Sequence, residues 1–176
     1  MIERLSKMVA RWKYRRHQLG KSYASFYYFG QVGVALPVSE TFIYWPVDRP
    51  IALQVTQLSD FEAVGQRIQL ALQRPVALQK DVSDSTLHLD YEAEFLAGME
   101  EFRACLGIGK RRFERELDVI SIYHDPTGML TLSKRVQAHG RFAFEGVARA
   151  DYERTLDAGY ANLEIGEAIF SLSDTP

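Results

Sequence analysis

Histidine and cysteine, the side chains that most often bind transition metals, are few and widely spaced in this sequence. The four histidines stand at positions 17, 88, 124 and 139, and the single cysteine is Cys105. His88 and Asp90 could place two ligands on one face of a strand, but no second pair has the spacing that a zinc site needs. The sequence therefore predicts no metal site.

Nucleophilic and phosphate-binding patterns are also missing. There is no Gly-x-Ser-x-Gly elbow, and Cys105 lies at the end of an apolar helix pattern, which predicts a buried, unreactive thiol. The segment Gly107–Lys110 resembles part of a phosphate loop, yet Ala104 and Arg111 stand where that loop requires Gly and Ser or Thr. We predict no catalytic residue and no cofactor.

Acidic residues are concentrated between positions 81 and 101, where seven occur without any lysine or arginine. Adjacent carboxylates on a helix project about 100° apart, so they do not converge on one proton as an acid–base pair must. An acidic surface attracts a basic partner and speeds the encounter; the alternative is a solvated helix face. The partner-binding surface that we predict consists of Asp90, Glu92, Glu94, Glu100 and Glu101.

The first 21 residues are basic, although the whole chain has a net charge of −2. Apolar residues in Ile2–Gln18 have the spacing of a helix, although Trp12–Arg15 also alternates like an edge strand. Within it, Arg11–His17 could contact phosphates and stack on bases, or it could pack Trp12 and Tyr14 while its cations reach solvent. An overall isoelectric point of about 6.1 favours the second alternative.

The apolar patterns predict an α+β fold with small antiparallel sheets, each packed by helices. Short aromatic and β-branched runs over residues 22–55 predict an antiparallel meander. A capping box formed by Ser59 and Glu62 opens a helix over 59–73, before Pro75. A helix over 91–106, a short basic helix over 110–116, a hairpin of strands near 118–123 and 129–134, and a last helix over 162–172 follow.

This order indicates two lobes that share a strands-then-helix arrangement. The predicted boundaries are 1–75 for the N-terminal lobe, 76–90 for a linker and 91–176 for the C-terminal lobe; a single merged domain is the alternative. Val64–Ile68 and Ile165–Ile169 resemble each other, and both place a glycine where a strand could pack closely against the helix. We expect these residues to be buried: Val64, Ile68, Ile120, Ile122, Leu130, Leu132, Ile165 and Ile169.

Composition and targeting signals predict a cytoplasmic protein with no membrane partner. Of the 176 residues, 47% are hydrophobic and 25% charged, which is ordinary for a globular protein. A single cysteine cannot form an internal disulfide, and the charged N-terminus is not followed by the apolar stretch of a signal peptide. The longest uncharged stretch, residues 22–39, is interrupted by Gly and Pro.

The order of features from Glu94 onward resembles the immunity proteins of contact-dependent growth inhibition systems in Gram-negative bacteria. A Phe-rich helix ends in Leu106-Gly107-Ile108, a strand and hairpin follow, and the chain closes with Glu164-Ile165-Gly166-Glu167-Ala168-Ile169. The helix that begins Ser59-Asp60-Phe61 is similar to the first half of the longer members. The sequence departs from the family pattern at Lys110–Arg112, where an aromatic residue is expected, and residues 150–159 have no clear counterpart.

The resemblance implies a stoichiometric inhibitor, not an enzyme. Such a protein stays in the cytoplasm and binds the C-terminal toxin domain that sibling cells deliver, often a nuclease, without contacting nucleic acid itself. The acidic surface would meet the basic groove of that toxin; an aromatic surface around Tyr27, Tyr44 and Trp45 is the alternative contact. The alternative function is a small RNA-associated or regulatory module that uses the basic N-terminal segment.

Overall fold

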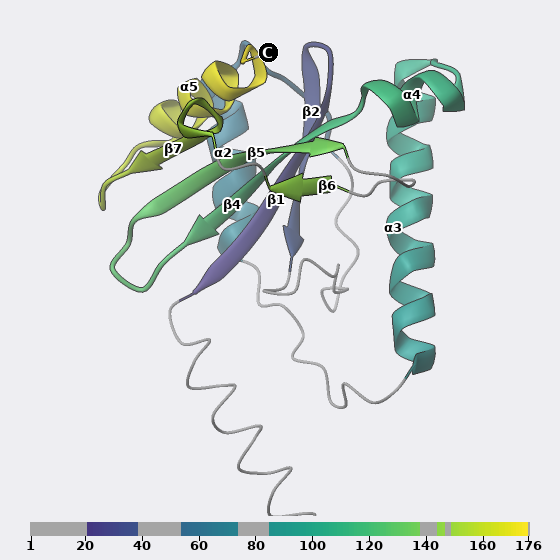
Figure 1. The fold of residues 1–176 in the computed structure, drawn as a ribbon, viewed down its shortest axis with the longest axis horizontal. Coiled ribbons are helices and arrows are strands. Elements are labelled where there is room, and N and C mark those ends of the chain that lie inside the picture. Colours follow the sequence, from purple (N-terminus) through teal and green to yellow (C-terminus); the bar gives the residue numbers. More distant parts are fainter. Residues whose placement is uncertain (1–20, 39–53, 74–84, 138–143, 147–148, 176) are drawn as a thin grey trace, which may run out of the picture.

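The chain forms an antiparallel sheet with two layers of helices, described here from a computed structural model (Figure 1). The structure describes residues 21–38, 54–73, 85–137, 144–146 and 149–175; the side chains of Val38 and of residues 85–94 are outside that description. In chain order the elements are β1 (Ser22–Phe29), β2 (Val32–Val38), β3 (Thr56–Gln57), α2 (Phe61–Gln73), α3 (Ser85–Leu106), α4 (Lys110–Glu116), β4 (Asp118–His124), β5 (Leu130–Gln137), β6 (Phe144–Gly146), a 3₁₀ turn (Ala150–Tyr152), β7 (Glu153–Leu156) and α5 (Asn162–Ser173).

The predicted α+β class is confirmed, and the strands of both predicted lobes form one seven-stranded sheet. The strand order is β3-β2-β1-β4-β5-β6, and β7 also pairs with β5. The two predicted sheets join because β1 pairs with β2 on one edge and with β4 on the other, where Ser25 lies opposite Ser121. The pairing of β1 with β4 spans about half the chain, and local patterns do not reveal it.

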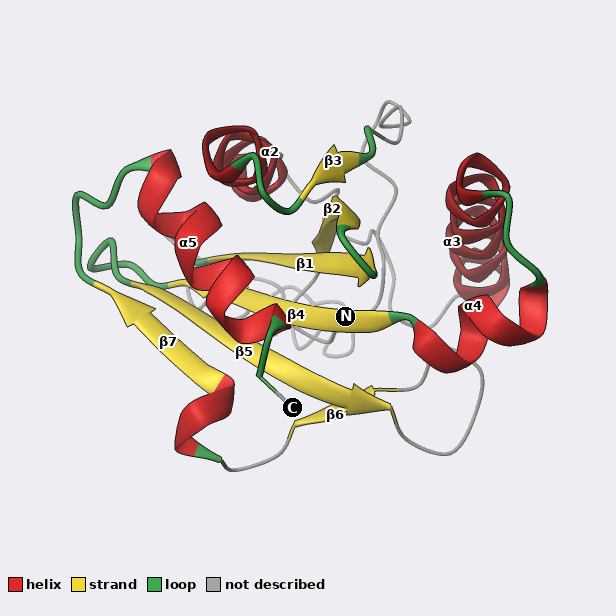
Figure 2. Cartoon of the chain, turned by 90° about the horizontal axis from the view of Figure 1, so that it is seen from above, coloured by secondary structure: helices red, strands yellow, loops and turns green. Residues whose placement is uncertain are grey.

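Helices α2 and α5 lie side by side on one face of the sheet (Figure 2). Their apolar sides pack on alternate residues of the central strands, such as Phe26, Ile120 and Leu132. All eight residues that we expected to be buried are at most 1% exposed, which confirms that prediction. This face holds the larger of the two cores.

Two glycines allow α2 and α5 to touch backbone to backbone. A Cβ on Gly65 would overlap the Asn162 backbone, and a Cβ on Gly166 would overlap the Phe61 backbone. Each glycine stands four residues after the first residue of its own helix, so the crossing is reciprocal. The similarity predicted between Val64–Ile68 and Ile165–Ile169 marks this crossing. The close neighbour of each glycine is the other helix, however, and not a strand as we expected.

The start of α2 differs by one residue from the predicted capping box. The helix begins at Phe61, and Asp60 Oδ1 accepts a hydrogen bond of 3.1 Å from the Ala63 amide. Asp60 is therefore the N-cap in place of Ser59, because its carboxylate reaches the third helical amide. Both side chains suit this role, and the sequence pattern alone does not choose between them.

Removal of this cap gives a first test. Asp60→Ala is expected to lower the free energy of unfolding by about 1 kcal/mol, since the Ala63 amide loses its acceptor. Ser59→Ala, the control at the exposed neighbouring position, should leave stability within about 0.5 kcal/mol of wild type. Urea denaturation measures both variants. A larger loss of stability in Ser59→Ala than in Asp60→Ala would indicate that Ser59 is the N-cap, as the sequence predicted.

Other boundaries moved by a few residues. Helix α3 begins at Ser85, so residues 85–90 of the predicted linker are helical. Helix α4 has the predicted bounds, and both strands of the predicted hairpin are present as β4 and β5. The predicted helix Ile2–Gln18 lies outside the described residues. In the described part of the chain, no helix combines the length and apolar character needed to cross a bilayer.

Candidate functional site

The apolar side of α3 attaches this helix to the face of the sheet that α2 and α5 leave uncovered. Met99 and Phe102 are fully buried, and the Phe95 ring lies 5.7 Å from the Tyr27 ring, centroid to centroid. Tyr27 alternates with residues that face α2 and α5, so it points to the opposite side of β1. Met99 and Phe102 therefore also face the sheet and not the solvent.

The predicted acidic residues all belong to α3. Glu101 is exposed, and Glu100 forms an ion pair of 2.8 Å with Arg103, which leaves the Glu100 side chain 38% exposed. Asp90, Glu92 and Glu94 stand on the same helix, but their side chains are outside the described set. The fold thus brings the five positions onto one helix, where Glu100 is paired with a cation.

The short helix α4 is held firmly against the end of α3. Arg103 Nη1 donates a hydrogen bond of 2.8 Å to the Ile108 carbonyl, and the rings of Phe102 and Phe113 meet edge to face at 5.6 Å. Gly107 turns the chain between the two helices with a φ of 65°, a left-handed conformation that favours glycine. Figure 1 shows α4 beside the C-terminal end of α3.

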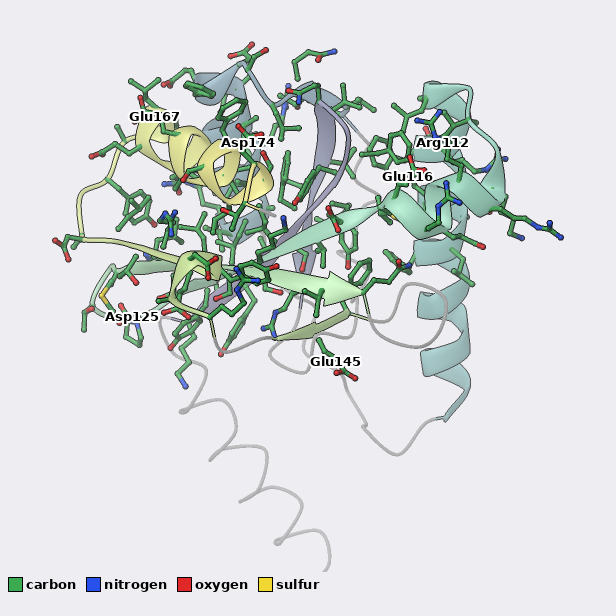
Figure 3. All side chains as sticks on the ribbon, turned by 45° about the horizontal axis from the view of Figure 1, so that its top comes forward. Arg112, Glu116, Asp125, Glu145, Glu167 and Asp174 are labelled. Atoms are coloured by element: carbon green, nitrogen blue, oxygen red, sulfur yellow. The ribbon has the colours of Figure 1, made fainter. Side chains whose placement is uncertain are left out.

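Four cations project from α4, and they fall into two pairs. Arg112 and Arg115 both contact Glu116, at 2.9 and 2.6 Å, and the hydrogen bonds from Arg115 and then Arg112 lower the pKa of that carboxyl (Figure 3). The Arg112 guanidinium also lies 5.5 Å from the Phe29 ring centre. Lys110 and Arg111 are exposed and form no ion pair within the described part of the chain.

Two predictions about single residues need correction. The Cys105 thiol, predicted to be buried, is exposed, because the buried side of α3 passes through Met99 and Phe102 and leaves Cys105 outside it. Tyr27, part of the alternative aromatic surface, is only 3% exposed, and burial raises the pKa of its hydroxyl. A partner therefore cannot contact Tyr27 directly. Tyr44 and Trp45 lie outside the described residues.

A second group of titratable residues lies beneath the end of α5. Lys134 is 8% exposed; its Nζ donates a hydrogen bond to the Thr175 carbonyl and lies 5.7 Å from the Tyr152 ring centre. Burial raises the pKa of Asp118, and the positive charge of Lys134 opposes that shift. This group fastens the end of the chain to the sheet. Among the described residues, no three His, Cys, Asp or Glu side chains gather as metal ligands would.

The raised pKa of Asp118 predicts a pH dependence of stability. The folded carboxyl binds its proton more tightly than the unfolded one, whose pKa is 3.8. The contribution of protonated Asp118 to the free energy of unfolding is therefore complete below pH 3.8. It is lost as the pH rises through the folded-state pKa. We expect wild type to lose stability relative to Asp118→Asn as the pH is raised from 3.8 towards neutrality, measured by urea denaturation. A gain in stability of wild type relative to Asp118→Asn over that interval would contradict the predicted direction.

Comparisons with known proteins connect this fold to two solved structures. No protein-family model matches the chain, and no curated protein matches it significantly in sequence. A protein of unknown function from Neisseria meningitidis is 19% identical, with a TM-score of 0.68 over 89% of this chain and 96% of that chain. A chain of the CdiA-CT/CdiI toxin and immunity complex from Yersinia pseudotuberculosis is 15% identical, with a TM-score of 0.68 over 87% of this chain and 96% of that chain. At such low identities, the TM-scores show a shared fold.

Proposed function

We propose that this protein is an immunity protein that binds a cognate toxin domain and neutralises it by stoichiometric inhibition in the cytoplasm. The observation that carries the proposal is the fold shared, over nearly the whole length of both chains, with a chain of a toxin and immunity complex. The residue pattern from Glu94 onward, which resembles immunity proteins, favours the inhibitor over the toxin within such a pair. In this proposal the protein acts by binding and has no turnover.

The proposed contact is the acidic side of α3. A nuclease is usually basic where it grips phosphate, so carboxylates at that groove would imitate its substrate and block access. Glu100 and Glu101 stand on a helix whose other side is fixed by the buried Met99 and Phe102. Because the helix cannot shift freely, its charges meet the partner already in position, which reduces the entropy lost on binding.

Co-expression tests this function. The probe is the C-terminal domain of the large secreted protein whose gene we expect directly upstream of this one. Expressed alone, that domain should arrest growth, and co-expression of this chain should restore it; expression of this chain alone should be harmless. The proposal fails if no such gene precedes this one, if growth is not restored, or if this chain is itself toxic.

Removal of the α3 carboxylates tests the proposed contact. In the variant Glu92→Gln, Glu94→Gln, Glu100→Gln and Glu101→Gln, association with the toxin domain should be about 10-fold slower at low salt, with a flatter salt dependence. Carboxylates at the rim of an interface act mainly on the association rate, whereas a fully desolvated pair acts on the dissociation rate. Stopped-flow mixing at low and high salt measures the association and dissociation rates.

A matched variant separates the local effect from net charge. Glu145→Gln, Glu153→Gln, Asp157→Asn and Glu167→Gln removes four exposed carboxylates outside α3 and changes the net charge equally (Figure 3 labels Glu145 and Glu167). Its association rate should stay within about 2-fold of wild type. Equal slowing in the two variants would contradict a contact on α3.

A further inference from the structure

Positive and negative charges adjoin where α3 meets α4. We call this surface the α3–α4 corner and define it by Glu100, Glu101, Lys110 and Arg111. Glu101 is exposed on the last turns of α3, and Lys110 and Arg111 are exposed at the start of α4. Arg112 and Arg115 are already engaged by Glu116, whereas Lys110 and Arg111 have no ion-pair partner in the described residues. Because both of these side chains are exposed, they can contact another molecule.

The spacing between the two signs is fixed by the fold. Arg103 bridges the corner, because its Nε contacts Glu100 at 2.8 Å while its Nη1 binds the Ile108 carbonyl at 2.8 Å. Phe113 is 1% exposed and packs on both Phe102 and Phe29, so α4 cannot rotate without opening this core. A partner consequently meets two helices in fixed positions, from which the carboxylates and cations project in a set order.

We propose that the α3–α4 corner orients the toxin domain by docking two of its patches at once. Lys110 and Arg111 receive an acidic patch of the same domain whose basic surface meets the carboxylates of α3. This inference rests on the proposed function and adds to it the charge pattern of the partner. A uniformly charged partner would be attracted by one helix and repelled by the other, whereas a partner with both signs fits in one orientation only.

The corner suits a protein better than a nucleic acid. A polyanion bound at Lys110 and Arg111 would also approach the exposed carboxylate of Glu101. Repulsion from this group weakens the attraction of the two cations, because phosphate repeats along the strand and cannot avoid it. A folded protein can instead place one acidic patch beside one basic patch. A protein surface with an acidic patch beside a basic patch is thus the ligand that the corner fits.

Charge reversal at single positions tests the orientation. Lys110→Glu and Arg111→Glu should each associate with the upstream-encoded toxin domain about 3- to 10-fold more slowly at low salt, and high salt should remove the difference. Arg67→Glu is the matched control: it makes the same charge change on α2, behind the other face of the sheet, and should alter the rate less than about 2-fold. Stopped-flow mixing measures all three.

A compensating change makes the test specific. Substitution of one particular Asp or Glu of the toxin domain by lysine should restore the association rate of Arg111→Glu. A scan of such substitutions, one acidic residue at a time, should identify that residue. Rates that are unchanged in Lys110→Glu and Arg111→Glu would overturn the inference. Faster association would do so too, because a uniformly basic partner gains from added carboxylates.

The same series separates this inference from the proposed function. If wild type does not bind the toxin domain at all, the proposed function fails. If wild type binds but the α4 reversals leave association unchanged or faster, only the charge pattern is wrong. Binding of a labelled single-stranded RNA by wild type, and its loss in Arg111→Glu, would assign the corner to nucleic acid and overturn the inference.

Discussion

Gly166→Ala is expected to lower the free energy of unfolding by about 3 kcal/mol, although alanine is the better helix former. The added Cβ would overlap the Phe61 backbone, and backbone atoms cannot rotate aside as a side chain can. The two helices must therefore separate, which opens the core between them at Ile165 and Val64. Gly65→Ala should have an effect of similar size, because its Cβ would overlap Asn162.

Urea denaturation followed by circular dichroism measures this loss. Gly109→Ala is the matched control, since nothing lies within 4 Å of its Cβ and its φ of −70° suits any residue. That variant should be within about 1 kcal/mol of wild type. An unfolding midpoint of Gly166→Ala equal to that of Gly109→Ala would show that the helices do not cross at these glycines.

Phe102→Ala is expected to destabilise the protein by about 3–5 kcal/mol and to weaken the binding that we propose to the toxin domain. Phe102 is fully buried and joins α3, α4 and the sheet through its contact with Phe113. Its loss leaves a cavity beneath both helices, so the carboxylates of α3 and the cations of α4 lose their fixed spacing. Binding should therefore weaken even under conditions in which the variant remains folded.

The neighbouring position supplies the control. Glu101→Ala removes an exposed side chain beside Phe102 and should leave stability within about 0.5 kcal/mol of wild type. Phe102→Leu keeps most of the buried volume and should bind more tightly than Phe102→Ala. Equal toxin affinity of folded Phe102→Ala and wild type would mean that α3 and α4 take no part in binding.

Those parts of the fold that depend on short-range patterns were predictable. The bounds of α4 and the buried residues Val64, Ile68 and Ile169 follow from the spacing of apolar residues along a helix. The hairpin of β4 and β5 follows from a Pro and Gly turn between two alternating runs. In each of these cases the signal lies within about ten residues.

The single sheet could not be predicted in the same way. It depends on the pairing of β1 with β4, in which Tyr23 lies opposite Tyr123 and the two rings stack at 5.0 Å. Two aromatic residues 100 positions apart carry no local sign that they will meet. The prediction that Cys105 is buried was wrong for a related reason. The position of the sheet decides which side of α3 is buried, and the residues near Cys105 in the sequence do not show where the sheet lies.

The candidate site was predictable in its charges but not in its geometry. The acidic run that includes Glu100 and Glu101 is plain in the sequence, and so is the basic Lys110–Arg112 that departs from the family pattern. Their relation depends on contacts made through Arg103 and Phe113, neither of which carries a recognisable motif. The two-signed surface therefore emerges only once α3 and α4 are packed together.

The most direct test of stoichiometric neutralisation is a titration of the purified toxin domain with this protein. The residual activity of the domain would be measured at increasing molar ratios, with both proteins well above their dissociation constant. We predict a linear fall that reaches zero at an equimolar ratio and does not change with incubation time. Full activity at a large excess would contradict the account. Progressive inactivation of the toxin domain by a small fraction of a molar equivalent of this protein would also contradict it, because each molecule of this protein would then have to inactivate many toxin molecules.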